Sequence, residues 1–360
     1  MDEVQITELE LNGLQGFDSY RVPGLVTLSS GDLLTYYEGR QNEGGRRTLL
    51  MRRSRDGGCT FGPRVVLAQP TGDELLHNPM LLSGPEDRVW LFWCQDYSHL
   101  FVRESRDGGT TFGPTRELTQ IIDGFRREWP VTLWSISPGH GVRMTDGTLV
   151  IPLWLSRGEN AHLPACFACL YSTDQGTSWQ CSNTVPAGNG VGDPTEASVA
   201  QRRDGTLLAT MRHEVPGVRR RAFCQGGPRR WSAPWLDQAL PDPVCSGALL
   251  TLKDGRMAFV NCAYGDEPAL ERQRRGEAVR WSLDARQQLT LRLSGDDGTT
   301  WSKGLMLEWE AGASDLGQSP DGRTLYCFYE RGWREGNCIF NRSLVLARVP
   351  LSRLEAEERG

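Results

Sequence analysis

Four aspartates, Asp56, Asp107, Asp174 and Asp296, occupy the same place in four copies of one pattern, Ser-x-Asp-x-Gly-x-[Thr/Ser]-[Trp/Phe]. Repeated carboxylates of this kind could hold calcium or act as acids. Asp and Gly are also turn residues, because the Asp side chain bonds nearby backbone N–H groups and Gly accepts a positive φ. Identical turns spread along a repeat cannot all face one site. We therefore predict that these aspartates shape hairpins between antiparallel strands, each followed by a strand that begins at the aromatic residue.

Other groups of residues that could bind a metal or a ligand give weaker signals. Cys166 and Cys169 form a single CxxC with no second pair, so two strand residues of the core are a better interpretation than a metal site. The arginine runs at 219–221, 229–230 and 272–275 are typical of solvated faces. No constellation of metal ligands is visible, although calcium in a propeller loop stays open, and we expect no cofactor.

The composition is typical of an all-β chain. Its 360 residues include 41 glycines and 20 prolines, which suits many short strands joined by tight turns. A net charge of −5 argues against a nucleic-acid partner. The acidic N-terminal stretch has no apolar run, and no segment approaches the ~18 apolar residues of a membrane span. We expect a cytoplasmic protein with its ten cysteines as free thiols. The sequence indicates no oligomeric state.

Strand-like runs recur between turn signals along the whole chain. They lie at 24–28, 33–37, 48–52, 89–94, 148–153, 165–171, 206–211, 256–262, 289–293, 325–329 and 344–348. Asp-Gly or Ser-Gly pairs alternate with the octapeptides, which gives two turns, and so about four strands, in each unit of ~60 residues. Residues 225–231 resemble a worn further copy. Four-stranded sheets repeated around an axis make a β-propeller. We predict one six-bladed β-propeller domain over residues 1–350, followed by a C-terminal tail, 351–360, which is the one long stretch typical of an amphipathic helix and which we expect to be solvated.

A propeller leaves a funnel at one end of its axis, so polar residues at strand ends there are candidates for a site. At this point the chain resembles a known family. The octapeptides are similar to the Asp boxes of sialidases (neuraminidases), and other segments resemble that family's signature regions in the same order. They are residues 20–23 (Tyr-Arg-Val-Pro), 37–40 (Tyr-Glu-Gly-Arg), 77–79 (His-Asn-Pro) and 138–141 (Pro-Gly-His-Gly). The resemblance spans nearly the whole chain.

The resemblance also implies roles for particular residues. Arg21, Arg212 and Arg286 correspond to the three arginines that hold the substrate carboxylate in this family, while Arg40 and Asn78 belong to motifs that line the pocket. Arginine suits this task because it stays charged and its planar fork matches a carboxylate. Glu196 corresponds to the family's glutamate, which takes the proton of a tyrosine nucleophile while a further acid protonates the leaving oxygen.

The chain departs from the family pattern at the nucleophile. The family's tyrosine would precede the Ser-Asp-Leu stretch at 314–316, and this chain has Ala313 there. Tyr264, Tyr326 or Tyr329 could substitute from a neighbouring strand or loop. The sequence around Tyr329 matches a strand motif, which favours packing inside a sheet. We take Tyr264 as the candidate nucleophile.

The family's acid is also missing. An aspartate would follow the arginine of the Ala-Glu-x-Arg stretch, but residues 41–46 contain one carboxyl group, that of Glu43, which is therefore the candidate acid.

Two functions follow from these residues. The first is an exo-glycosidase of sialidase type that removes a terminal acidic sugar, most simply sialic acid. Without the tyrosine, Glu196 could activate water, with inversion instead of retention, and a uronic or ulosonic acid could be the substrate. The second is a non-catalytic propeller that binds an acidic glycan or a protein partner. Hydrolysis of a fluorogenic sialoside separates the two.

Overall fold

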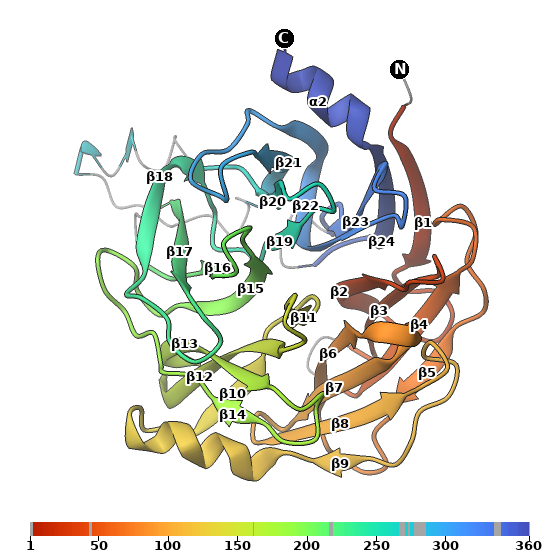
Figure 1. Cartoon of the computed structure of the whole chain (residues 1–360), viewed down its shortest axis with the longest axis vertical. Coiled ribbons are helices and arrows are strands. Elements are labelled where there is room, and N and C mark those ends of the chain that lie inside the picture. The colour runs from red at the N-terminus through yellow and green to blue at the C-terminus, as the bar shows by residue number, and fades with distance from the viewer. Residues whose placement is uncertain are drawn as a thin grey trace.

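The computed structural model describes residues 3–42, 45–160, 162–215, 219–265, 271–272, 274–276, 286–334 and 340–359. Most of them lie in antiparallel strands, and the sheets stand around a central axis like the blades of a propeller (Figure 1). The predicted all-β, propeller-like fold is confirmed. No helix in the described ranges is long and apolar enough to cross a membrane.

Four sheets are built from consecutive strands. The first contains β2 (Ser19–Thr27), β3 (Leu33–Arg40), β4 (Arg47–Ser54) and β5 (Val65–Ala68). The second contains β6 (Leu76–Ser83), β7 (Val89–Gln95), β8 (His99–Ser105) and β9 (Arg116–Glu117). The third contains β10 (Leu133–Ile136), β12 (Leu149–Asn160), β13 (Leu163–Ser172) and β14 (Gln180–Cys181), with β11 (Val142–Arg143) paired to β12. The fourth contains β15 (Thr195–Gln201), β16 (Leu207–Arg212), β17 (Arg220–Gly226) and β18 (Trp235–Pro241).

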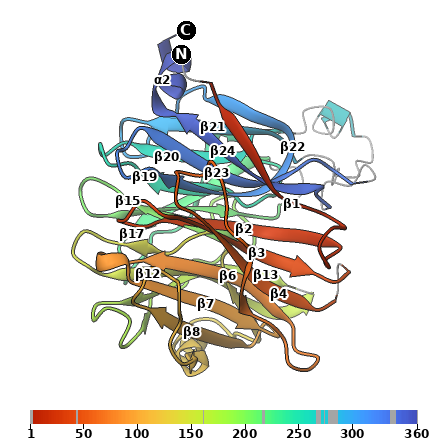
Figure 2. The same cartoon turned by 90° about the vertical axis from the view of Figure 1, so that its right-hand side faces the viewer.

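A seven-stranded sheet closes the structure. It contains β19 (Ala248–Thr251), β20 (Met257–Cys262), β21 (Gln287–Ser294), β22 (Leu305–Gln318), β23 (Thr324–Arg331), β24 (Ser343–Pro350) and β1 (Gln5–Leu11). Strand β22 pairs with β21 through Glu310 and with β23 from Ala311 onward. Strand β1 pairs with β24, so the first strand of the chain lies beside its last strand (Figure 2).

Each repeated octapeptide joins the third and fourth strands of a four-strand unit. In the first copy the Ser54 hydroxyl accepts a hydrogen bond from Gly58 N at 2.8 Å and donates one to Asp56 at 2.7 Å, while Asp56 accepts from Thr60 N at 2.9 Å. The other three copies repeat these bonds. The closing aromatic residue precedes the next strand and does not begin it, since these strands begin at Val65, Arg116, Gln180 and Leu305. A turn at 225–231 stands at the same place between β17 and β18.

Two expectations about polar segments are corrected. The C-terminal segment forms helix α2 (Leu351–Arg359), and it is not fully solvated because the Leu354 side chain is completely buried against the last sheet. Arg221, expected on a solvated face, is completely buried because a buried aspartate, Asp242, neutralises it. Cys166 and Cys169 lie in β13 and are fully buried, as strand residues of the core.

Candidate active site

The described candidate residues of the site gather on one face, at the strand ends opposite the octapeptide turns. Ser19 pairs with Arg40 and Thr195 with Arg212 at this face, whereas Leu33 pairs with Ser54 at the other. The first strands of three sheets supply half of these residues, and strands further along each sheet supply the rest. The residues are Arg21 on β2, Arg40 on β3, Asn78 on β6, Glu196 on β15, Arg212 on β16 and Arg286, which directly precedes β21.

Irregular backbone marks this face. Three of the inner strands change register where a site residue stands, around Arg21, Asn78 and Glu196. Val22, Asn78 and Glu196 have φ values of 58°, 50° and 24°, a region that residues other than glycine seldom adopt. Such bulges turn a side chain away from the regular alternation of a strand, and strained residues concentrate at functional sites. The strand ends are thereby shaped to direct polar side chains toward the axis.

Arg21 is fixed by a glutamate from the opposite end of the chain. Its Nε donates to Glu330 Oε1 at 3.0 Å and its Nη2 reaches Oε2 at 3.5 Å. Glu330, whose side chain is 1% exposed, also accepts hydrogen bonds from the backbone N–H groups of Val22 (3.1 Å) and Ala313 (3.3 Å). Sequence reasoning missed this role, since Glu330 carried no signal beyond its place after a strand tyrosine.

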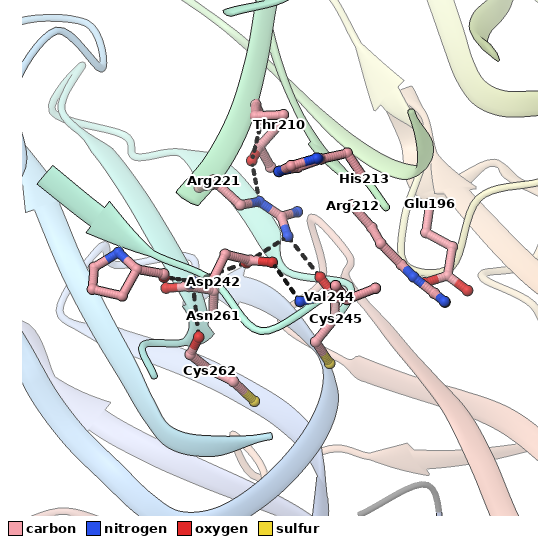
Figure 3. A network of polar contacts seen from close by, with 12 residues as sticks. Glu196, Thr210, Arg212, His213, Arg221, Asp242, Val244, Cys245, Asn261 and Cys262 are labelled. Carbon is pink, nitrogen blue, oxygen red and sulfur yellow. Dashed lines mark hydrogen bonds and ion pairs between the residues drawn. The ribbon is translucent and has the colours of Figure 1, made fainter. Parts of the chain in front are cut away.

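Glu196 lies within range of all three candidate arginines. Arg212 Nη1 donates to Glu196 Oε2 at 3.0 Å (Figure 3). Its Nη2 donates to Glu214 at 2.6 Å. Burial alone would raise the pKa of Glu196, but the charges of Arg212, Arg286 and Arg21 lower it below its usual value. Arg212 thus contacts Glu196 directly, and the charges of Arg286 and Arg21 also act on this carboxylate.

Two backbone contacts help to anchor Arg286. Its Nη2 donates to the carbonyl oxygen of Val244 at 3.3 Å, and its own carbonyl accepts from Trp333 Nε1 at 3.2 Å. The positive charge of Arg286 also opposes that of Arg212: burial and Arg286 both act to lower the pKa of Arg212, while Glu196 and Glu214 raise it, with a net increase. Two like charges are thus held near each other.

Arg40 and Asn78 share one buried carboxylate. Arg40 contacts Glu38 Oε2 at 2.6 Å, and Asn78 N donates to Glu38 Oε1 at 2.7 Å. Burial alone would raise the pKa of Glu38, but Arg40, Arg47 and this N–H group lower it to about 2. The side-chain amide of Asn78 donates to Ser135 Oγ (2.9 Å) and to the carbonyl oxygen of Ile136 (2.8 Å). Asn78 therefore links two sheets at the edge of the site.

The three candidate tyrosines lie in different parts of the structure, and one of them lies near the candidate arginines. Tyr264 follows β20 and is half-buried, and the hydrogen bond from Ala263 N to the Gln288 carbonyl keeps its segment beside that of Arg286. Tyr326 lines a cavity of about 610 Å³ at the opposite face, together with Asp56, so it cannot replace the missing nucleophile. Tyr329 is fully buried in the core.

The sequence also singled out Glu43 as the candidate acid and Ala313 at the position of the family's tyrosine. Glu43, the candidate acid, lies outside the described residues. Ala313 is half-buried and donates its N–H to Glu330. Among the residues that are described, no three His, Cys, Asp or Glu side chains are grouped so that they could hold a metal ion.

A histidine–aspartate pair, His140 and Asp315, joins two of the sheets. His140 Nδ1 lies 2.7 Å from Asp315 Oδ1, and Asp315 Oδ2 accepts from Leu25 N at 2.9 Å. Burial would lower the pKa of His140, but the Asp315 carboxylate raises it above its usual value. The loop at 138–141 and the Ser-Asp-Leu stretch are therefore in contact, which their separation in sequence did not predict.

Comparison with known proteins supports the resemblance to sialidases. A family model described as a BNR repeat-like domain matches residues 31–337. A sialidase of Micromonospora viridifaciens is 28% identical over 360 residues, covering 90% of this chain and 52% of that protein, and a sialidase of Bacteroides fragilis is 28% identical over 320 residues, covering 79% and 54%. The chain thus spans about half the length of these relatives.

Solved structures share the fold. The Hadza microbial sialidase Hz136 superposes with a TM-score of 0.73 at 22% identity, covering 94% of this chain and 67% of that one. The Trypanosoma rangeli sialidase in complex with sialic acid gives a TM-score of 0.73 at 14% identity, covering 100% of this chain and 60% of that one.

Proposed function

This chain belongs to the sialidase superfamily through its BNR repeat-like domain, and on that premise we propose that it is an exo-glycosidase that removes a terminal acidic sugar. Sialic acid is the first candidate, because the relatives are sialidases and one structural neighbour binds that sugar. The observation that supports the proposal is that Arg212 donates to Glu196 at 3.0 Å, while the charges of Arg286 and Arg21 act on the same carboxylate.

The proposed architecture is a six-bladed propeller over residues 1–350. Strand β22 changes partner at Ala311, so the seven-stranded sheet divides into two four-stranded units that share this strand. Together with the other four sheets they make six blades. The octapeptide turns then act as Asp boxes on the face away from the site.

The three arginines are proposed to hold the carboxylate of the sugar. Each charge-assisted hydrogen bond contributes about 1.5–3 kcal/mol, so three of them could anchor a sugar acid. Glu330 orients Arg21, and the backbone of Val244 orients Arg286. Arg40 and Asn78 would border the same pocket.

Glu196 is proposed as the base. Its lowered pKa keeps it ionised at neutral pH, so it can accept a proton from the attacking group. With Ala313 at the usual tyrosine position, that group is water or the hydroxyl of Tyr264. The attacking oxygen bonds to the anomeric carbon as the glycosidic bond breaks, and Glu43 gives its proton to the leaving oxygen. Attack by water inverts the configuration, whereas attack by Tyr264 followed by water retains it.

The second candidate function is binding of the same ligand without hydrolysis. Ala313 removes the usual nucleophile, which favours a propeller that binds an acidic sugar and does not cleave it.

A panel of fluorogenic substrates tests these proposals. We expect hydrolysis of a sialoside or, failing that, of a glucuronide, and none of a neutral galactoside, because the arginines require an anion. Product stereochemistry followed by NMR separates water from Tyr264, and Tyr264→Phe should leave an inverting enzyme active. If nothing is hydrolysed while free sialic acid still raises the melting temperature, the binding function is correct. If neither occurs with any acidic sugar, both proposals are wrong.

A further inference from the structure

A completely buried ion pair lies behind the candidate arginines. Arg221 Nη1 donates to Asp242 Oδ2 at 2.9 Å, and their side chains are 0% and 1% exposed (Figure 3). Arg221 Nε also donates to Thr210 Oγ1 at 2.6 Å, and Asn261 Nδ2 donates to Asp242 Oδ2 at 3.1 Å. Burying two charges costs desolvation energy that their attraction often does not exceed, so stability alone is a weak explanation for this pair.

The ion pair holds the two ends of a strained turn. Val244 has a φ of 64°, which for a β-branched residue is a genuine outlier that persists only when its surroundings impose it. Its N–H donates to Asp242 Oδ1 at 3.1 Å. Beyond it, the carbonyl oxygen of Cys245 accepts from Arg221 Nη1 at 2.6 Å. The ion pair therefore fixes the peptide group that precedes Val244 and the one that follows Cys245, and the Val244 carbonyl group lies between these two fixed points.

The strained turn has one visible consequence at the site. The carbonyl oxygen of Val244 accepts the hydrogen bond from Arg286 Nη2 at 3.3 Å. Arg286 and Arg212 repel each other, and the hydrogen bond to this carbonyl oxygen helps to oppose their separation. A carbonyl oxygen in a fixed place does so without adding a further negative charge, which would compete with an anionic ligand.

We propose that Arg221 and Asp242 are positioning residues that fix the Val244 carbonyl oxygen and thereby hold Arg286 ready for the carboxylate of the ligand. This inference rests on the proposed function for the identity of the ligand. An arginine that is already oriented loses less freedom on binding, and this gain in affinity is the expected benefit of the pair.

The test is a double-mutant cycle on binding of free sialic acid, measured by calorimetry well below the melting temperature. Asp242→Asn keeps the shape of the side chain and removes its charge, and we expect the Kd to rise about tenfold, the value of one charge-assisted hydrogen bond. In an Arg286→Ala background the same substitution should change the Kd by less than about twofold, because its effect passes through Arg286. An equal loss in both backgrounds would show a merely structural role and overturn the inference.

Glu10→Gln is the matched control. Glu10 is another buried carboxylate, paired with Arg52 at 2.7 Å in a different part of the fold, so its loss should lower stability without changing the Kd. Thr210→Val, which removes the acceptor of Arg221 Nε and keeps the side-chain shape, serves if Asp242→Asn does not fold. It should weaken binding about two- to threefold, again only when Arg286 is present.

A ligand-free crystal structure of the Asp242→Asn variant separates this inference from the proposed function. We expect Val244 to leave its positive φ and Arg286 to lose the carbonyl oxygen as a partner. If both features persist in the variant, the positioning role is wrong whether or not any sugar binds. If they are lost but wild-type protein binds no acidic sugar, the positioning role stands and the proposed ligand is wrong.

Discussion

Replacing Glu196 by Gln should have opposite effects on binding and on turnover. Glu196 Oε2 occupies Arg212 Nη1 at 3.0 Å, a guanidinium that the proposed ligand carboxylate also needs. The substitution removes a negative charge that repels the ligand and competes for its partner. It also removes the base, because an amide cannot accept the proton of the attacking group.

The size of the binding effect follows from the exposure of the pair. Two unit charges a few ångströms apart near a protein surface attract by roughly 4 kcal/mol at an effective dielectric constant of about 20. The Glu196 and Arg212 side chains are 27% and 23% exposed, so water screens this attraction to about 1 kcal/mol. Affinity for free sialic acid should therefore rise about fivefold. Turnover of the hydrolysed substrate should fall by about 10²- to 10⁴-fold.

Glu214→Gln is the control for this experiment. Glu214 accepts the other arm of Arg212 at 2.6 Å, so its loss should raise affinity by a similar factor while turnover stays within about threefold of wild type. Calorimetry with sialic acid gives the affinity, and release of a fluorescent aglycone gives the turnover. Unchanged turnover in Glu196→Gln would remove Glu196 from the chemistry, and weaker binding would refute the competition for Arg212.

Three further predictions address the ligand, the turns and the pH dependence. Arg286→Ala should weaken binding of sialic acid by about 30-fold, roughly 2 kcal/mol, in the same calorimetric assay, and an unchanged Kd would mean that this arginine is misassigned. Asp107→Ala deletes the acceptor of hydrogen bonds from Ser105 and Thr111, so urea unfolding should show a loss of about 1–2 kcal/mol with the Kd unaltered; a weaker Kd would contradict a purely structural turn. Asp315 raises the pKa of His140, so the stability gained from this ion pair is complete below the unfolded pKa of about 6.5 and disappears as the pH rises through the higher folded value. His140→Gln should flatten this part of the stability profile between pH 5 and 9, and an unchanged slope would exclude His140 as its origin.

The regular strands of the fold could be predicted because the residues of each segment alone indicate a strand. The run at 165–171 matches β13 since this strand is buried on both faces and is therefore continuously apolar. Strands β9 and β14 could not be predicted, because each has two residues and is defined by its pairing in the sheet and not by its composition. The amphipathic pattern of residues 351–360 indicates helix α2, but its docking could not be predicted because it depends on a single buried leucine, Leu354.

The site was predicted less completely, because much of it depends on contacts between distant segments. Arg21, Arg212 and Glu196 stand in motifs that follow a known order. The partners of these residues do not: Glu330 reaches Arg21 from 309 positions away, and no local pattern announces that contact. Arg221 belongs to an arginine run that is typical of solvent, and only Asp242 in the folded state explains its burial.

The pairing of β1 with β24 determines when this molecule can finish folding. During synthesis the N-terminal strand emerges first, but its partner emerges only after some 330 further residues, so it must wait with unpaired backbone groups exposed. Among the strand pairs that the structure describes, this one closes the longest loop, and its formation is expected to be slow. Once β1 and β24 are paired, they hold the ring of sheets closed. A force or a protease that frees β1 would therefore start unfolding at this pair.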